Sequence, residues 1–216
     1  MIKQAGIAVA GLLILTCAAL AQDGRFQVSV NPVGVLSKQS SGNQITLNPT
    51  QGYGVVFSGQ FRLAPKFSLQ ANFGHMDNSQ KYTTTTLVYR VQSTLTEGSA
   101  ALVFRPFSTP KWKPFVFGGV GALVFNPDNT TVISPNPVTP SQPIETQENI
   151  GAVRQTQVAI LYGGGVDHEL PMVPFLRIRL QYRGLFYSAP AFGVPFLFVG
   201  QRGHIAEPSI GLVFNF

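Results

Sequence analysis

Charged residues at alternate positions are the side chains of this chain best placed to do chemistry. The stretch FLRIRLQYRGLFY carries Arg177, Arg179 and Arg183 on one parity and mostly apolar residues on the other. An earlier stretch carries Asp167 and Glu169 on a single parity as well. Because successive side chains of a strand point to opposite faces, these charges gather on one face of a sheet. A symmetric hairpin between the two stretches would place Asp167 opposite Arg177, a favourable cross-strand pair.

The same face of the expected strands carries nine charged residues in all. These five bases and four acids are Arg62, Glu97, Arg105, Asp167, Glu169, Arg177, Arg179, Arg183 and Glu207. A buried charge without a partner is very costly, so charges on one inward face must pair with each other or with trapped water. The set predicts a structural ion network, with a gated ion path or a ligand site as the alternative.

Eight segments with a period of two position these charges. They cover residues 25–35, 52–63, 67–76, 92–105, 115–125, 154–169, 175–187 and 204–216. Three connections are short, at 64–66, 106–114 and 170–174, and they alternate with long ones, of which 126–153 is rich in Pro, Thr and Asn. An even number of strands with short turns on one side and long loops on the other is typical of a membrane β-barrel. Closure of the barrel pairs every strand edge.

The composition narrows the class of protein. The chain has 216 residues, of which only 11% are charged, and it has 17 Phe and 22 Gly. No run reaches the roughly 18 apolar residues that a spanning helix needs, which excludes a helical membrane protein. The formal net charge is +6, but the bases are scattered singly, which excludes nucleic acid as a partner.

The first residues predict export. Lys3 precedes an apolar run over 5–15, and Ala19-Leu20-Ala21 fits a small-residue cleavage site. We therefore expect a signal peptide over 1–21, cleaved after Ala21, and one barrel domain over 22–216. A lipoprotein signal with Cys17 as the modified residue is the alternative.

The last segment ends in PSIGLVFNF, with apolar residues at Ile210, Leu212, Phe214 and Phe216. Together with PFVFGGVGALVF, LYGGGVDHEL and the eight segments, it resembles the small porin-like outer-membrane barrels of the outer-membrane protein A transmembrane-domain type. The resemblance implies an all-β fold, an eight-stranded antiparallel transmembrane β-barrel with short periplasmic turns and long extracellular loops, in the bacterial outer membrane. It also implies that the four apolar residues of the last segment form the recognition signal for the barrel-assembly machinery.

The resemblance specifies fold better than activity. The expected role is structural or adhesive, with four mobile loops outside and a lumen plugged by charged side chains. The alternative is a small channel for hydrophobic or other small solutes, resembling the outer-membrane protein W group. Expected partners are outer-membrane lipid and lipopolysaccharide, the assembly machinery and an extracellular ligand bound through the loops. No cofactor and no metal are expected.

An enzyme is a further alternative, because some barrels of this size modify lipid A. The deacylases among them carry a His-x-Ser pair, and none of His75, His168 and His204 is followed by a serine at that spacing. We expect His75 and His204 at the loop side and His168 at the turn side, too far apart to act together. The prediction is therefore that the protein is not an enzyme.

A secreted, lipocalin-like barrel with its apolar face inside also fits the alternation. The terminal Phe and the alternating loop lengths favour the membrane barrel. In that case aromatic residues at the strand ends form two girdles facing lipid. They are Tyr53, Phe73, Phe125 and Tyr187 on one rim, and Phe26, Phe67, Trp112 and Phe115 on the other.

Overall fold

The computed structural model describes residues 25–85, 87–135, 143–173 and 175–216, and the expected signal peptide lies outside this part of the chain. No helix in the described part is long and apolar enough to cross a membrane. Strands dominate, with one short 3₁₀ helix, η2 (Pro195–Leu197). The strands are β1 (Phe26–Ser37), β2 (Ser40–Gly42), β3 (Ile45–Pro49), β4 (Gly52–Ala64), β5 (Phe67–Thr83), β6 (Val88–Phe104), β7 (Trp112–Ser134), β8 (Ile144–Gln147), β9 (Gln155–Glu169), β10 (Leu176–Ser188) and β11 (Arg202–Asn215).

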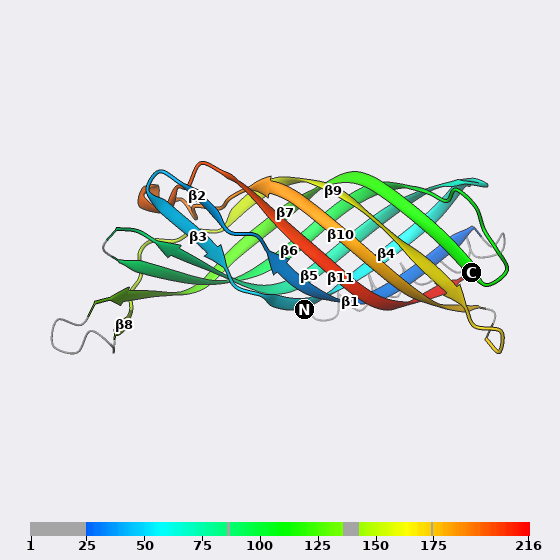
Figure 1. Cartoon of the computed structure of the whole chain (residues 1–216), viewed down its shortest axis with the longest axis horizontal. Coiled ribbons are helices and arrows are strands. Elements are labelled where there is room, and N and C mark those ends of the chain that lie inside the picture. The colour runs from blue at the N-terminus through cyan, green and yellow to red at the C-terminus, as the bar shows by residue number, and fades with distance from the viewer. Residues whose placement is uncertain (1–24, 86, 136–142, 174) are drawn as a thin grey trace, which may run out of the picture.

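Eight of these strands close into an antiparallel barrel (Figure 1). The order around the barrel is β1, β4, β5, β6, β7, β9, β10 and β11, and β11 pairs with β1 to close it. The eight strands predicted from the period of two are thus confirmed. The connections from β4 to β5, β6 to β7 and β9 to β10 lie together at one end, on the right in Figure 1, which we name the turn end. The opposite end is the loop end.

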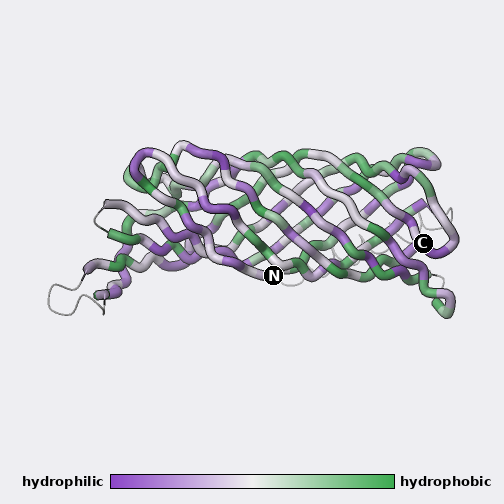
Figure 2. The backbone as a smooth tube through the Cα atoms, viewed as in Figure 1, coloured by the Kyte–Doolittle hydropathy of each residue, from purple (hydrophilic) through white to green (hydrophobic). Residues whose placement is uncertain are grey.

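The two faces of the barrel wall differ in polarity in the sense expected for a membrane barrel. Figure 2 shows hydrophobic and hydrophilic residues alternating along the strands. The outward face exposes large apolar side chains, among them Phe57, Leu69, Val120, Ile160, Leu180 and Leu212. The inward face of the turn-end half buries polar ones, among them Gln27, Ser29, Asn31, Ser58, Gln60, Gln70 and Asn72. A soluble barrel would bury the first set and expose the second, so the lipocalin-like alternative is wrong.

The strands β5, β6 and β7 continue past this apolar band at the loop end. β7 has 23 residues, whereas about 9–11 suffice to span a bilayer. The hairpin β2–β3 adds to β5, and β8 adds to β7. We name this projecting sheet the wall: β2, β3, β8 and residues 75–83, 88–96 and 126–134. The predicted strands over 67–76 and 92–105 leave a long connection over 77–91. That prediction is wrong, because β5 and β6 pair continuously to Thr83 and Val88.

Candidate functional site

The turn-end half of the lumen contains a cluster of ions centred on Asp167, a fully buried carboxylate. Arg179 approaches it with two nitrogens, with Nε 2.7 Å from Oδ1 and Nη2 2.9 Å from Oδ2. Nη2 of Arg105 lies 3.3 Å from the same Oδ2. The two guanidinium carbons lie 4.7 and 5.8 Å from the centre of the Phe115 ring. The Arg179–Asp167 contact is a bidentate salt bridge, and such charge-assisted hydrogen bonds are strong in a low-dielectric site.

The rim of the turn end carries a second ion cluster around Glu169. Arg177 lies beside it, with Nη2 3.0 Å from Oε1, and Lys113 also pairs with Oε1. The Glu169 side chain is 30% exposed, so water screens these pairs more than those of Asp167. Lys113, which sequence reasoning missed, enters the cluster because it lies opposite Asp167 in the register of β7 and β9, two residues from Glu169 on the same face.

A third group of ions lies at mid-height, where Arg183 faces two carboxylates. Arg183 pairs with Glu97 from β6, and its Nη1 lies 3.2 Å from Oε2 of Glu207 on β11. All three side chains are fully buried. Ser99 donates a hydrogen bond of 2.6 Å to Glu97. We name Arg183, Glu97 and Glu207 the triad, and its two acids share one base.

Eight of the nine charges predicted to face the lumen lie in or beside these three clusters. The exception is Arg62, which lies exposed near the turn end and makes no ion pair with the described residues. The register of β4 against β5 shifts between Arg62 and Ala64, so the strand ends in a bulge at this point. The side chain therefore reaches solvent instead of the packed lumen.

The predicted pairing of Asp167 with Arg177 is wrong. Arg177 lies opposite Glu169, and Asp167 lies opposite Arg179. The pairing of Arg177 with Glu169 centres this hairpin on Val173, one residue later than the centre of a symmetric turn over 170–174. Moving the centre of a hairpin by one residue shifts the residue opposite Asp167 by two positions. The new partner, Arg179, is therefore on the same face of β10 as Arg177.

Apolar side chains fill the loop-end half of the lumen. The strands contribute Val56, Met76, Leu95, Leu123, Leu161, Leu185 and Ile205, all buried. The segment Ala189–Gln201 folds over them and buries Phe192, Val194, Leu197 and Val199. We name this segment the cap.

Hydrogen bonds tie the cap to the strands around it. The Tyr82 hydroxyl donates to the carbonyl of Pro190 at 2.6 Å. Oε1 of Gln155 accepts from the amides of Ala191 and Phe192, each at 2.8 Å. Tyr82 belongs to the wall, and burial raises the pKa of its phenol well above the ordinary value, which keeps it a donor. A mobile loop was expected here, and the apolar run AFGVPFLFV is the signal that could have predicted a packed segment.

Some of the predicted girdle residues point inward instead. Phe115, Phe125 and Tyr187 are buried in the lumen, whereas Tyr53, Phe73, Phe67 and Trp112 are exposed on the outside. The inward ones pack in the interior, since Phe125 contacts both Tyr187 and Phe192. An aromatic residue at a strand end thus does not by itself indicate a lipid-facing position.

The three histidines lie apart, as the sequence predicts. His75 is exposed on β5 beside Thr96, and His168 packs against Trp112 at the turn end, with ring centres 4.2 Å apart. His204 on β11 lies with Nε2 2.9 Å from the Tyr162 hydroxyl. Among the described residues, no group of three or more His, Cys, Asp or Glu side chains is placed to hold a metal ion.

The last strand is paired along its whole length. Ile210 and Leu212 are exposed on the outer face, and Phe214 lies between Val28 of β1 and Leu176 of β10. The amide of Phe216 donates to the carbonyl of Phe26 at 3.0 Å. Three apolar residues of the predicted assembly signal thus share the outer face of β11, and the fourth, Phe216, lies exposed just past its end. Their recognition by the assembly machinery stays a prediction.

Comparison with known proteins identifies the fold and no more. No protein-family model matches the chain, and no curated protein matches it. Among solved structures, the outer-membrane protein OprG from Pseudomonas aeruginosa is similar with a TM-score of 0.56 at 11% identity, covering 89% of this chain and 96% of OprG. Neisserial surface protein A is similar with a TM-score of 0.51 at 14% identity, covering 88% of this chain and 97% of that protein. The chain therefore has the fold of small outer-membrane β-barrels.

Proposed function

We propose that the protein is an outer-membrane barrel of a diderm bacterium with a closed lumen and a structural or adhesive role. The fold shared with OprG and Neisserial surface protein A supports this location, as does the outward apolar band. The proposal includes export with cleavage after Ala21. It also includes lipid and lipopolysaccharide around the barrel and an extracellular ligand that contacts the loop end.

The observation that carries the proposal is that buried side chains occupy the lumen at three heights. The Asp167 cluster lies at the turn end, the triad lies in the middle, and the cap lies at the loop end. The interior of an eight-stranded barrel is about filled by its own side chains. Solute passage would require several buried ion pairs to separate, and breaking such a pair is strongly unfavourable.

The wall is the part of the molecule best suited to contact another surface. Its outer face on β5 carries His75, Asp77, Ser79 and Lys81 in place of the apolar residues below them. Paired strands hold these side chains at a fixed height above the apolar band, which keeps the surface preorganised for binding. No active site with catalytic geometry accompanies it among the described residues, and we expect no enzymatic activity.

The alternative function, a small channel, is favoured by the polar atoms at mid-height. Oε1 of Glu207 and the side-chain amide of Gln181 are buried without a hydrogen-bond partner in the protein, and Oε2 of Glu207 has only the ion pair with Arg183. Such atoms would line a polar path if the cap moved. The two functions therefore differ in whether the cap is a permanent part of the core or a gate.

Planar-bilayer conductance separates the two functions. The folded protein is compared with a variant in which residues 190–199 are replaced by a short Gly-Ser linker. The closed-lumen proposal predicts no unitary current from either protein. Current from the wild type would contradict the proposal, and current from the linker variant alone would identify the cap as a gate.

An adherence assay tests the role of the wall. A variant that replaces residues 78–93 with Asn-Gly shortens the hairpin in register, because Asp77 pairs with Thr94. Cells that display this variant should adhere less to epithelial monolayers and to polystyrene than cells that display the full wall. Equal adherence, with equal amounts of folded barrel, would remove the adhesive role.

A further inference from the structure

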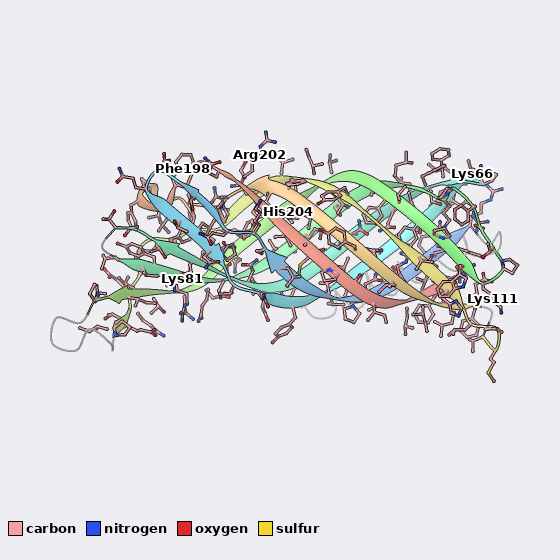
Figure 3. The ribbon with its side chains drawn as sticks, viewed as in Figure 1. Lys66, Lys81, Lys111, Phe198, Arg202 and His204 are labelled. Carbon is pink, nitrogen blue, oxygen red and sulfur yellow. The ribbon has the colours of Figure 1, made fainter. Side chains whose placement is uncertain are left out.

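A groove of about 470 Å³ lies on the outside of the barrel, at the loop-end border of the apolar band. Its lining combines two kinds of side chain. Lys38, Arg202, His204 and Ser40 form the polar part, and Ile160 and Phe186 form the apolar part. None of the described residues that line this groove is acidic. Figure 3 shows the Arg202 and His204 side chains on the outside of the barrel wall.

Strand pairing sets the polar part directly above the apolar part. The amide of Lys38 donates to the carbonyl of His204 at 2.9 Å, so β1 and β11 bring their bases together. His204 lies opposite Phe186 of β10, and their ring centres are 4.6 Å apart. Phe186 in turn lies opposite Ile160 of β9. Lys38 and Arg202 therefore place positive charge just above the apolar band on this side of the barrel.

The charges of the groove differ from those of the lumen. Each lumen arginine of the three clusters has a carboxylate partner, whereas Lys38 and Arg202 are exposed and form no ion pair with the described residues. The Ser40 hydroxyl oxygen is buried without a hydrogen-bond partner. Free bases at the height of a membrane interface attract anionic headgroups, and each contributes separately to the attraction.

We propose that this groove binds a phosphorylated lipid of the leaflet that surrounds the loop end. The phosphate lies between Lys38 and Arg202, and an acyl chain runs along Ile160 and Phe186. The apolar part distinguishes a lipid from a free anion, because its side chains lie on the membrane side of the bases. The groove lies outside the lumen and meets the wall only at the start of β2, at residues 40–41. The inference names a site for the lipid contact that the proposed function includes, and it rests on that function.

Lipid retention in native mass spectrometry tests the site. The folded barrel in a neutral detergent is titrated with a diphosphorylated acyl saccharolipid, with the same lipid lacking phosphate, and with inorganic phosphate. The Lys38→Gln/Arg202→Gln variant should bind the phosphorylated lipid roughly thirty-fold more weakly at low salt, and Lys38→Gln alone about five-fold more weakly. Removal of phosphate from the lipid should weaken its binding to the wild type by a similar factor.

A matched variant controls for net charge. Lys81 and Arg90 lie opposite each other on the wall and away from the groove, so Lys81→Gln/Arg90→Gln removes the same charge. It should bind the lipid as the wild type does. Equal binding by the two double variants would overturn the site. Displacement of the lipid by equimolar inorganic phosphate would overturn the assignment of a lipid. If the double groove variant does not fold, the test rests on Lys38→Gln alone, and wild-type binding by this variant would overturn the site.

Discussion

Replacing Arg183 with methionine should destabilise the barrel strongly, because it leaves two carboxylates without a base. Glu97, Glu207 and Arg183 all have fully buried side chains. Removing one partner of a buried pair typically costs about 3–5 kcal/mol, because the remaining charge is uncompensated. With a denaturant slope of about 2 kcal/mol per molar urea, a loss of about 4 kcal/mol lowers the unfolding midpoint by about 2 M.

The unfolding can be followed in lipid vesicles by the fluorescence of Trp112, the only tryptophan of the chain. Two controls separate the triad from a general effect of losing an arginine. Arg62→Met removes an exposed base from the positions of β4 whose parity faces the lumen, and it should change stability by less than about 0.5 kcal/mol. The triple variant Glu97→Gln/Arg183→Met/Glu207→Gln removes every charge of the triad and should recover most of the loss. A shift for Arg183→Met no larger than that for Arg62→Met would refute the reasoning.

Three further predictions test the closing strand, the cap and the packing of the barrel wall. Phe216→Ala should lower the amount of assembled barrel in the outer membrane, measured by the fraction that migrates as folded protein, and unchanged amounts would argue against an assembly signal. Tyr82→Phe removes the hydrogen bond to the cap, so it should cost about 1 kcal/mol and speed proteolysis within 189–201; proteolysis at the wild-type rate would mean that this bond does not hold the cap. Gly119→Ala places a Cβ 2.0 Å from a backbone oxygen of β6, whereas a Cβ on Gly98 meets nothing within 4 Å. Gly119→Ala should therefore unfold at lower urea than Gly98→Ala, and equal midpoints would show that the barrel strands shift to accept the added methyl group.

The fold could be predicted because lipid imposes a simple rule on the outer face. Within the apolar band every second residue must be apolar, so the period of two can be recognised in the sequences of β4, β10 and β11. Above the band the outer face meets water, and this requirement no longer applies. The residues of β5 and β6 beyond His75 are polar on the outside, and the run of threonines near the hairpin tip is typical of a loop. The strands continue there because the cross-strand ladder satisfies the backbone, a condition that side-chain alternation does not reveal.

The lumen charges could be predicted as a set but not as pairs. Parity determines which face of a strand a charge occupies, and Asp167, Glu97 and Glu207 lie buried on the predicted face. The partner of Asp167 depends on the centre of the turn after β9, which alternation does not determine. In the triad, Arg183 of β10 lies directly opposite Glu207 of the next strand, β11. Glu97 comes from β6, which is far away in the sequence, and closure of the barrel brings it across the lumen to Arg183.

The cap was missed because its apolar residues follow no period. Phe192 and Leu197 are buried from a segment that has turns and one short 3₁₀ helix instead of a strand. Phe192 adopts a φ of 52°, a conformation that bulky residues seldom take, and its neighbours hold it there by packing and by two amide hydrogen bonds to Gln155. The apolar composition of 191–199, and not a period, is the signal that could have predicted a packed segment.

The measurement that tests the central claim most directly is the electrophoretic mobility of the outer-membrane fraction in detergent, heated against unheated. A barrel whose apolar band faces lipid should fractionate with the outer membrane and resist detergent until it is boiled. The account predicts a folded band that shifts on heating, from a chain that begins at Gln22. Protein found in the soluble exported fraction, with no heat-dependent shift, would contradict the account.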